Sequence, residues 1–237
     1  GETGSATVTF IATDDCGNTS TTTATFTIED TTPPVIDPAA SDLTVECDGA
    51  GNTSDLTTWL ASNGGAAATD VCSSVTWTND FTELSDDCGL TGSAVVTFTA
   101  TDDCGNTSTT TATFIIEDTT PPVIDTEASD LTVECDGAGN TEDLNTWLNS
   151  NGGAAASDVC GNVSWSNDFT ELSDGCGLTG SAVVTFTATD DCGNTSTTTA
   201  TFIIEDTTPP IITTEADDLT VECDGAGNTE DLNTWLN

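Results

Sequence analysis

The chain has 237 residues and carries 41 Asp and Glu but no Lys, Arg or His, so its formal net charge is −41. Phosphate, nucleic-acid and anionic-membrane binding through basic side chains is therefore excluded. Catalysis by a His base, a Lys Schiff base or an Arg clamp is excluded for the same reason. No run of about 18 apolar residues occurs, so we expect no membrane insertion.

A repeat of 88 residues organises the chain: Gly4-Ser5-Ala6 recurs at Gly92 and again at Gly180. Each repeat is long enough for one small domain, and we expect the chain to be part of a longer array. Asp-Thr-Thr-Pro-Pro stretches separate the repeats, because paired prolines suit a short stiff linker better than a central strand. The predicted divisions are the closing strands of an incomplete repeat (1–30), two complete repeats (31–118 and 119–206) and the opening part of a further repeat (207–237).

Taken in chain order, the complete repeats contain several segments in which apolar and polar residues alternate. This period-two alternation predicts strands with one buried face. In the repeat 31–118 the residues predicted to point inward are Leu43, Val45, Cys47, Val75, Trp77, Phe81, Ala94, Val96, Phe98, Ala100, Ala112, Phe114 and Ile116.

A helix interrupts the strands in the first half of each repeat. In 119–206 we expect it to be capped by Thr141, to carry acidic residues in its first turn and to end before Gly152-Gly153. Its apolar stripe is Leu144, Trp147 and Leu148. These elements predict an all-β fold of tandem Ig-like antiparallel β-sandwiches with one short helix per 88-residue repeat.

Ten cysteines follow the same repeat, with four in each period. A zinc site is disfavoured, because the sequence contains neither a Cys-x-x-Cys pair nor a His. Disulfide bonds in an exported protein are the favoured interpretation, which predicts a secreted or cell-surface location.

Strand geometry limits how these cysteines can pair. Cys88 and Cys104 flank a strand of about eleven residues, roughly 36 Å long, so they are expected at opposite ends of the domain. Cys72 is expected beside Cys104, and Cys47 beside Cys88. The predicted pairs are therefore Cys47–Cys88, Cys72–Cys104, Cys135–Cys176 and Cys160–Cys192. The alternative joins Cys16 to Cys47 and Cys72 to Cys88, with their copies, and uses all ten thiols, although one bond then crosses a linker.

Acidic residues gather just before Cys72 and Cys104 and in the linker that reaches the same end of the domain. Oxygen ligands in this number suit Ca²⁺, which takes six to eight of them. The competing interpretation is a solvated acidic surface of the kind found in salt-adapted proteins. The candidate calcium ligands are Glu29, Asp30, Asp70, Asp102 and Asp103, and one repeat later Glu117, Asp118, Asp158, Asp190 and Asp191.

Two segments, TVTFIATDDCGNTSTTTATFTIEDTTPPVI and SDLTVECDG, resemble the hyalin-repeat (HYR) module, an Ig-like domain. They look most like its tandem forms in large secreted surface and adhesin proteins of gliding-type Gram-negative bacteria. The resemblance covers both complete repeats and departs from the usual pattern at 49–65, where a helix replaces a strand. It implies an extracellular location, an adhesive or structural role and no enzymatic activity.

Together these features predict an extracellular array that forms a calcium-stiffened, disulfide-stabilised rod or fibre. Its expected partners are neighbouring repeats, with lateral self-association into fibres as a further expectation. The alternative is an adhesin whose repeats themselves bind carbohydrate or another surface. A two-carboxylate glycosidase is disfavoured, because Trp59 and Trp77 lie in apolar stripes typical of a core. The resemblance also implies O-glycosylation of the linker residues Thr31, Thr119 and Thr207.

Overall fold

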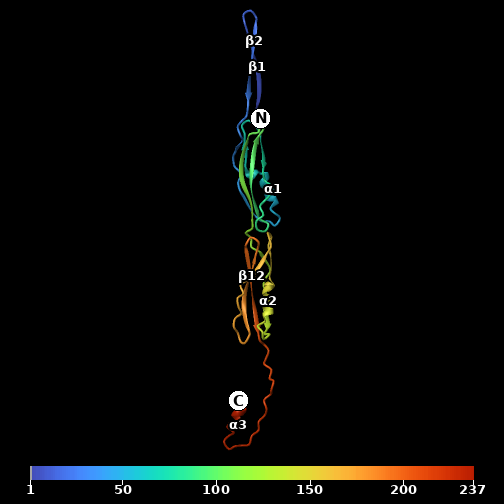
Figure 1. The fold of residues 1–237 in the computed structure, drawn as a ribbon, viewed down its shortest axis with the longest axis vertical. Coiled ribbons are helices and arrows are strands. Elements are labelled where there is room, and N and C mark those ends of the chain that lie inside the picture. Colours follow the sequence, from blue (N-terminus) through green and yellow to red (C-terminus); the bar gives the residue numbers. More distant parts are fainter. Residues whose placement is uncertain (1) are drawn as a thin grey trace.

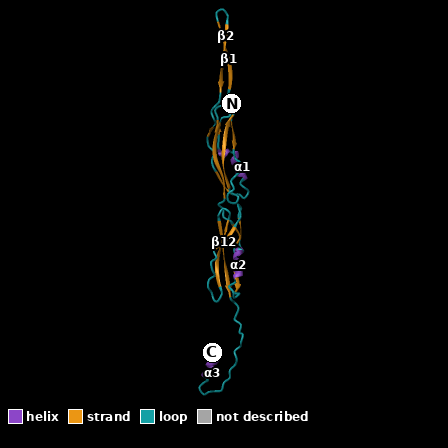
Figure 2. Ribbon diagram, in the orientation of Figure 1, coloured by secondary structure: helices purple, strands orange, loops and turns teal. Residues whose placement is uncertain are grey.

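The structure is a computed structural model that describes residues 2–237. Its parts follow one another along a single long axis, and the strands of both complete repeats run along that axis (Figures 1 and 2). We call residues 4–28 the hairpin, 31–118 the first unit, 119–206 the second unit and 207–237 the tail. The linkers are the Asp-Thr-Thr-Pro-Pro stretches at 30–34, 118–122 and 206–210, where these parts meet. None of the helices among the described residues has the length and apolar character of a membrane span.

A four-stranded sheet forms the main layer of the first unit. Strands β7 and β8 make a long antiparallel hairpin, and β6 lies antiparallel to β7. Strand β4 departs from the expected antiparallel order, because it joins β8 in parallel with Leu43 opposite Phe114. The sheet order is β4-β8-β7-β6, and the strands are Leu43–Glu46 (β4), Val75–Asn79 (β6), Gly92–Asp102 (β7) and Thr107–Glu117 (β8).

A short sheet and a helix form the second layer of this unit. Strand β3 (Val35–Ile36) pairs with β5 (Ala68–Thr69). Helix α1 (Thr53–Ala61) is followed by a single 3-10 turn, η1 (Asn63–Gly65). The unit is therefore an Ig-like β-sandwich in which the helix takes the place of part of one sheet.

The core of the first unit lies between the four-stranded sheet and α1. Trp59 meets Phe98 edge to face, with the ring centroids 5.3 Å apart, and it also packs against Phe114. Burial of each such large side chain contributes roughly 1.5–3 kcal/mol. The inward positions predicted on β7 and β8 are confirmed for Val96, Phe98, Ala100, Ala112, Phe114 and Ile116, all of which are buried.

The helix begins one residue earlier in the sequence than predicted. Thr141 is the first helical residue, and the cap is Asn140, whose φ of 47° lies in the left-handed region that Asn tolerates. The side chain of Asn140 donates to the carbonyl of Glu134 at 2.9 Å and accepts from the amide of Asp136 at 3.1 Å. These bonds close the glycine-rich loop onto the preceding strand, and Asn52 caps α1 in the same way.

The second unit repeats this architecture, with the sheet order β10-β14-β13-β12. The predicted apolar stripe of its helix is confirmed at Leu144 and Trp147, which are buried. Its elements are Val123–Thr126 (β9), Leu131–Glu134 (β10), Thr141–Asn149 (α2), Asn151–Gly153 (η2), Ala155–Ser157 (β11), Ser164–Asn167 (β12), Gly180–Thr189 (β13) and Thr195–Glu205 (β14).

The hairpin and the tail lack a second layer. Strands β1 (Gly4–Thr13) and β2 (Thr19–Ile28) pair with each other along their whole length, and every residue in them is exposed. Helix α3 (Thr229–Leu236) in the tail is exposed as well. Both segments have the sequences of elements that are buried in the complete units, so their exposure follows from missing neighbours.

Candidate metal and disulfide junction

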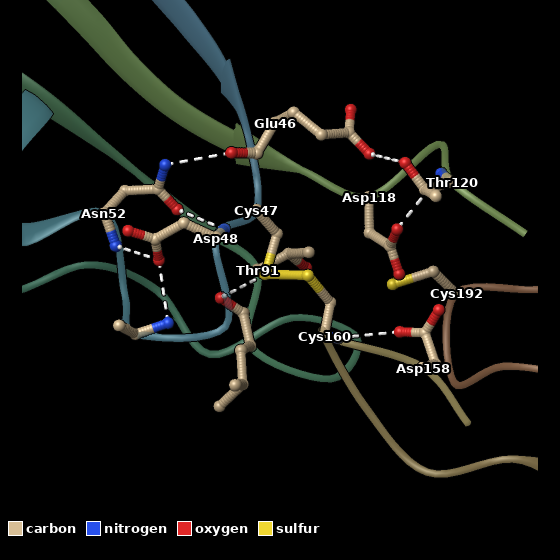
Figure 3. The surroundings of a disulfide bond; sticks show 12 residues. Glu46, Cys47, Asp48, Asn52, Thr91, Asp118, Thr120, Asp158, Cys160 and Cys192 are labelled. Carbon is tan, nitrogen blue, oxygen red and sulfur yellow. Dashed lines mark hydrogen bonds between the residues drawn. A yellow bond between two sulfur atoms is a disulfide. The ribbon is translucent and has the colours of Figure 1, made fainter. Parts of the chain in front are cut away.

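Two disulfide bonds cross the junction between the first and second units. Cys47 is bonded to Cys160, with the Cα atoms 6.1 Å apart. Cys88 is bonded to Cys192, with the Cα atoms 5.1 Å apart. We call the end of the first unit that carries Cys47 and Cys88 its lower end, and the end of the second unit that carries Cys160 and Cys192 its upper end. The equivalent ends of the other unit take the same names. Figure 3 shows the Cys47–Cys160 bond beside the linker and its acidic residues.

The predicted pairing within units is wrong. Cys47 and Cys88 do share one end of the first unit, but the short linker brings this end against the upper end of the second unit. Each bond therefore forms across the junction, and the alternative pairing of Cys16 with Cys47 is not formed either. The cysteines that remain free in the structure are Cys16, Cys72, Cys104, Cys135, Cys176 and Cys223.

Backbone contacts bring the two ends together. The amide of Leu90 donates to the carbonyl oxygen of Cys160 at 2.8 Å. Gly89 lies against the same carbonyl with a φ of 60°, and a Cβ at this position would overlap the oxygen atom. A larger residue at position 89 would therefore force the two units apart and would also strain the backbone.

Glu46 fixes the start of the linker. Its carboxylate accepts hydrogen bonds from the amide of Thr119 at 2.8 Å, the hydroxyl of Thr119 at 3.0 Å and the hydroxyl of Thr120 at 2.8 Å. These bonds, with the Thr119 amide first among them, hold the pKa of Glu46 below its ordinary value. The sequence does not predict this contact, although a Glu at the end of the β4 segment recurs in each repeat as Glu134.

Two of the threonines proposed as glycosylation sites take part in such contacts. The hydroxyl of Thr119 donates to Glu46, and the hydroxyl of Thr207 donates to Glu134 at 2.8 Å. Thr31 is exposed in the first linker. Glycosylation at the three positions stays a prediction, and at Thr119 or Thr207 it would remove a donor that positions the linker.

The second unit binds the linker from the other side. The side chain of Asn194 donates to the carbonyl of Asp118 at 3.0 Å, and its amide donates to the carboxylate of Asp190 at 2.9 Å. Asn106 makes the equivalent contact with the carbonyl of Asp30 at 3.2 Å in the first unit. The Asp-Asp-Cys-Gly-Asn turn therefore closes a strand hairpin and also binds the incoming linker.

Three of the predicted calcium ligands meet at the upper end of the first unit. Asp30, Asp70 and Asp102 each offer a carboxylate oxygen, and these oxygens all lie within 4.8 Å of one another. Asp102 is buried, and one oxygen of Asp30 is buried without a hydrogen-bond partner. Burial disfavours the charge on Asp102, but hydrogen bonds from Asn106 and Cys104 outweigh it and hold its pKa below the ordinary value.

A related group with two carboxylates lies at the junction. Asp118 and Asp158 lie together beside the sulfur of Cys160, which is already bonded in the disulfide, so the carboxylates are the available ligands. Asp190 is buried, and one of its oxygens has no hydrogen-bond partner. Burial raises the pKa of Asp118, with a further increase from the charges of Asp158 and Asp190 that the amide of Thr120 partly opposes.

Five predicted ligands lie outside these two groups, Asp190 among them. The carboxylate of Asp103 accepts from the hydroxyl of Ser74 at 2.9 Å, and Asp191 accepts from a backbone amide of the loop before β12 at 2.8 Å. Glu29 follows β2, and Glu117 ends β8, with both side chains exposed. The structure thus brings Asp30 together with Asp70 and Asp102, and Asp118 together with Asp158.

The two carboxylate groups fit a hard divalent cation. Two negative charges 4 Å apart repel by about 1 kcal/mol in water and by about 4 kcal/mol near a protein surface. The sequence supplies no basic side chain to offset this repulsion. Carboxylate and carbonyl oxygens are the ligands that Ca²⁺ prefers. One carboxylate oxygen of Asp30 and one of Asp190 are buried without a hydrogen-bond partner, and a bound cation would explain their burial.

No protein-family model and no curated protein matches this chain. Solved structures that it resembles include mouse clustered PcdhgC3 EC1-3, at 11% identity and a TM-score of 0.31, over 87% of this chain and 78% of that one. PcdhgB3 EC1-4 matches at 13% identity and a TM-score of 0.29, over 85% of this chain and 57% of that one, so this chain spans little more than half of it. We derive no function from likenesses at these TM-scores, and the hyalin-repeat resemblance stays a prediction.

Proposed function

We propose that this chain is an extracellular structural rod in which disulfide bonds and calcium ions hold consecutive units in line. The observation that carries the proposal is the pair of bonds Cys47–Cys160 and Cys88–Cys192, each of which joins two different units. Disulfide bonds form and persist in oxidising compartments, so the chain belongs outside the cell or at its surface. A mechanical or adhesive array fits this location and needs no catalytic group.

Two covalent bonds restrict a junction more than one bond does. A single bond would leave the second unit free to rotate about it, whereas bonds at two points of one interface remove that rotation. Cys47 follows β4 and Cys88 precedes β7, so the bonds attach at two separate parts of the first unit. The contacts of Glu46 and Asn194 with the linker add further restraints. A pulling force would therefore pass from unit to unit through covalent bonds.

Calcium completes the proposed junction. Asp118 comes from the linker, whereas Asp158 and Asp190 come from the second unit, so an ion bound by all three would tie the linker to the unit. Such an ion would also remove the repulsion among these charges. Extracellular modules bind Ca²⁺ with dissociation constants of about 10⁻⁴ to 10⁻³ M. At a hundredfold excess over the dissociation constant, binding stabilises the folded state by about 2.7 kcal/mol.

Calcium titration of the full chain tests this part of the proposal. We expect Ca²⁺ to raise the melting temperature and to lengthen the maximum dimension in small-angle X-ray scattering, and EDTA to reverse both effects. Asp190→Asn should weaken the response at the junction. Asp125→Asn is the matched control, because it removes the same charge from an exposed residue outside both groups.

Two results would contradict the proposal in different ways. If Mg²⁺ or Na⁺ at equal ionic strength acts as well as Ca²⁺, the carboxylates are a solvated acidic surface and the calcium part fails. If the fully reduced chain keeps the same maximum dimension and flexibility, the disulfide part fails. Specific binding on a glycan array would instead favour an adhesin whose units bind carbohydrate.

A further inference from the structure

The chain crosses the first unit five times between its upper and lower ends. Strands β4, β6 and β8 run toward the lower end, and β7 runs toward the upper end. The segment 47–72, which contains α1 and β5, also returns to the upper end. Each turning point carries one cysteine, with Cys47 and Cys88 at the lower end and Cys72 and Cys104 at the upper end. Three covalent segments therefore descend through the unit: 34–47, 72–88 and 104–118.

The segment from Pro34 to Cys47 is the shortest covalent route across the first unit. The hydroxyl of Ser108 donates to the carbonyl of Pro34 at 2.6 Å, and the amide of Cys47 donates to the carbonyl of Glu117 at 2.8 Å. These contacts place the ends of the segment beside two positions of β8 that lie about 30 Å apart at the ordinary strand rise. The segment has 13 residue steps and spans about 45 Å when fully extended. It can therefore lengthen by only about 15 Å.

The Cys47–Cys160 bond continues this segment into the second unit. A pull on the linker above the first unit therefore reaches the second unit without passing through residues 48–118. Those residues contain α1, β7 and β8, which form the core. Without the bond, the route from Pro34 to Asp118 would have 84 residue steps. Unfolding would then release about 250 Å instead of about 15 Å.

The Cys88–Cys192 bond has the equivalent effect in the second unit. Cys192 lies in the turn between β13 and β14 at the upper end, and β14 leads from it to the linker at Asp206. This segment has 14 residue steps and extends to about 50 Å. The β14 strand within it already spans about 36 Å, so the second unit can lengthen by only about 15 Å. Residues 119–191, with α2 and β13, lie outside this route.

We propose that each bond of the junction carries tension past the core of one unit, so that the chain is a tether of nearly fixed length. The first bond, Cys47–Cys160, bypasses the core of the first unit, and the second bond, Cys88–Cys192, bypasses the core of the second unit. An array of unbridged domains lengthens whenever one domain unfolds, whereas here an unfolded unit leaves the load on a short covalent segment. The inference rests on the disulfide part of the proposed function and is independent of the calcium sites.

The two bonds are not interchangeable under this proposal. Without the first bond, the shortest route across the first unit runs from Pro34 to Cys88, and unfolding of that unit releases about 150 Å. The second unit keeps its bypass. Without the second bond, the shortest route across the second unit runs from Cys160 to Asp206, and unfolding of that unit releases about 130 Å. The first unit then keeps its bypass.

Force spectroscopy on single full chains, pulled through peptide tags at the two ends, tests the proposal. The free thiols are alkylated to prevent disulfide exchange, and EDTA removes any contribution from calcium. Phe98→Leu weakens the core of the first unit, and Phe186→Leu weakens the core of the second unit at the equivalent position. Both side chains are fully buried, and the replacement keeps an apolar side chain in each core.

Each weakened chain is compared with both bonds present, without the first bond, without the second bond and without either. A bond is removed by substitution of both its cysteines, as in Cys47→Ser with Cys160→Ser. The matched control is Cys104→Ser with Cys135→Ser, because both residues are free thiols. The control should give the same unfolding steps as the chain with both bonds.

The unfolding steps should depend on which bond and which core are changed. With both bonds present, unfolding of either weakened unit should lengthen the chain by about 15 Å. Loss of the first bond should raise the step of Phe98→Leu to about 150 Å and leave that of Phe186→Leu at about 15 Å. Loss of the second bond should leave the step of Phe98→Leu unchanged and raise that of Phe186→Leu to about 130 Å.

The length at full extension is a second measurement, which does not depend on whether a weakened unit was folded at the start. The first bond joins residues 113 positions apart, so the chain with both bonds should be about 400 Å shorter than the chain without either. The second bond joins residues 104 positions apart and should by itself shorten the chain by about 360 Å.

Disulfide mapping of the same samples separates two kinds of failure. If both bonds are present but a unit with its bypass releases more than about 100 Å, the proposal is overturned and the covalent junction stands. The same holds if loss of the first bond lengthens the steps of the two weakened units equally. If mapping finds bonds inside the units instead, the disulfide part of the proposed function fails together with this inference.

Discussion

Cys47 and Cys160 are 113 residues apart in the sequence, yet their sulfur atoms are bonded and their Cα atoms lie 6.1 Å apart. The bond joins the residue after β4 of the first unit to the loop before β12 of the second. A disulfide inside one unit would stabilise that unit alone, whereas this one makes two units mechanically continuous. The second bond, between Cys88 and Cys192, gives the same junction a second covalent connection.

Removal of one of these bonds should lower the stability of the oxidised chain. Each bond closes a loop of more than 100 residues, for which chain entropy predicts a stabilisation of about 4.7 kcal/mol. We expect Cys88→Ser with Cys192→Ser to lower the free energy of unfolding by about 2–5 kcal/mol in denaturant titrations. Cys104→Ser with Cys135→Ser is the control, because both are free thiols. Equal effects of the two double variants would contradict the assigned pairing.

The internal repeat allows the same substitution to be compared in two environments. Phe98 is fully buried, whereas its counterpart Phe10 is 56% exposed. We expect Phe98→Ala to destabilise the chain by about 3–5 kcal/mol, through lost burial and the cavity left behind. Phe10→Ala should leave the melting temperature of the dilute chain within about 1 °C of the unmodified value, because surface substitutions change stability little. A similar loss in both variants would mean that the hairpin is packed in solution.

Period-two alternation predicted the buried face of β7 and β8 correctly, because side chains on a strand point alternately to its two sides. The same argument placed Cys47 and Cys88 at one end of the unit. It could not distinguish pairing inside the unit from pairing across the junction. Cys72 of the first unit and Cys160 of the second occupy equivalent repeat positions, so the pattern does not show which unit supplies the partner. The short linker brings the two ends into contact, so the bonds form across the junction. The length of the linker alone does not reveal how the two ends are oriented.

Local features of the loops were harder to predict. Thr141 has the composition of a cap, but Asn140 takes that place because the glycine-rich loop reaches the helix in a left-handed conformation. The contact of Glu46 with Thr119 joins residues 73 positions apart and has no periodic signal. The grouping of Asp30 with Asp70 and Asp102, and of Asp118 with Asp158, agrees with the predicted positions, because these follow from strand ends and a linker, which the repeat makes visible.

Substitution of Glu46 should loosen the linker locally. Its carboxylate accepts the amide hydrogen of Thr119, so Glu46→Ala removes the acceptor of that bond. We expect faster amide hydrogen exchange at Thr119 in this variant, with no change at Thr207. Glu134→Ala is the matched control in the second unit. It should accelerate amide hydrogen exchange at Thr207 and leave exchange at Thr119 unchanged. Unchanged exchange at Thr119 in Glu46→Ala would show that the contact does not persist in solution.

The metal-free junction should become more stable on mild acidification. Burial, together with Asp158 and Asp190, raises the pKa of Asp118 in the folded chain, although the amide of Thr120 opposes the shift. The stabilisation from its protonated form is therefore present below the unfolded pKa and is lost as the pH rises through the folded pKa. In EDTA, we expect the melting temperature to rise as the pH falls from neutral toward the ordinary carboxyl pKa of 3.8, and Asp118→Asn to reduce that rise.

Stronger acid should have the opposite effect. Hydrogen bonds hold the pKa values of Asp48, Asp80, Asp136 and Asp168 below the ordinary value of 3.8. Their stabilisation is present above the unfolded pKa and is lost as the pH falls through the folded pKa. Calorimetric scans across this range should therefore show a maximum in mildly acidic solution. A melting temperature that falls steadily from pH 7 in both the unmodified chain and Asp118→Asn would contradict the role assigned to Asp118.

Disulfide mapping of the non-reduced chain tests the central claim most directly. Free thiols are blocked before digestion, and a protease that cleaves at Asp or Glu is used because the chain has no Lys or Arg. Mass spectrometry should recover peptides that join Cys47 to Cys160 and Cys88 to Cys192, so that the two units remain linked even when the chain between them is cut. Recovery of Cys47 bonded to Cys88 and Cys160 bonded to Cys192 would contradict a covalently bridged rod.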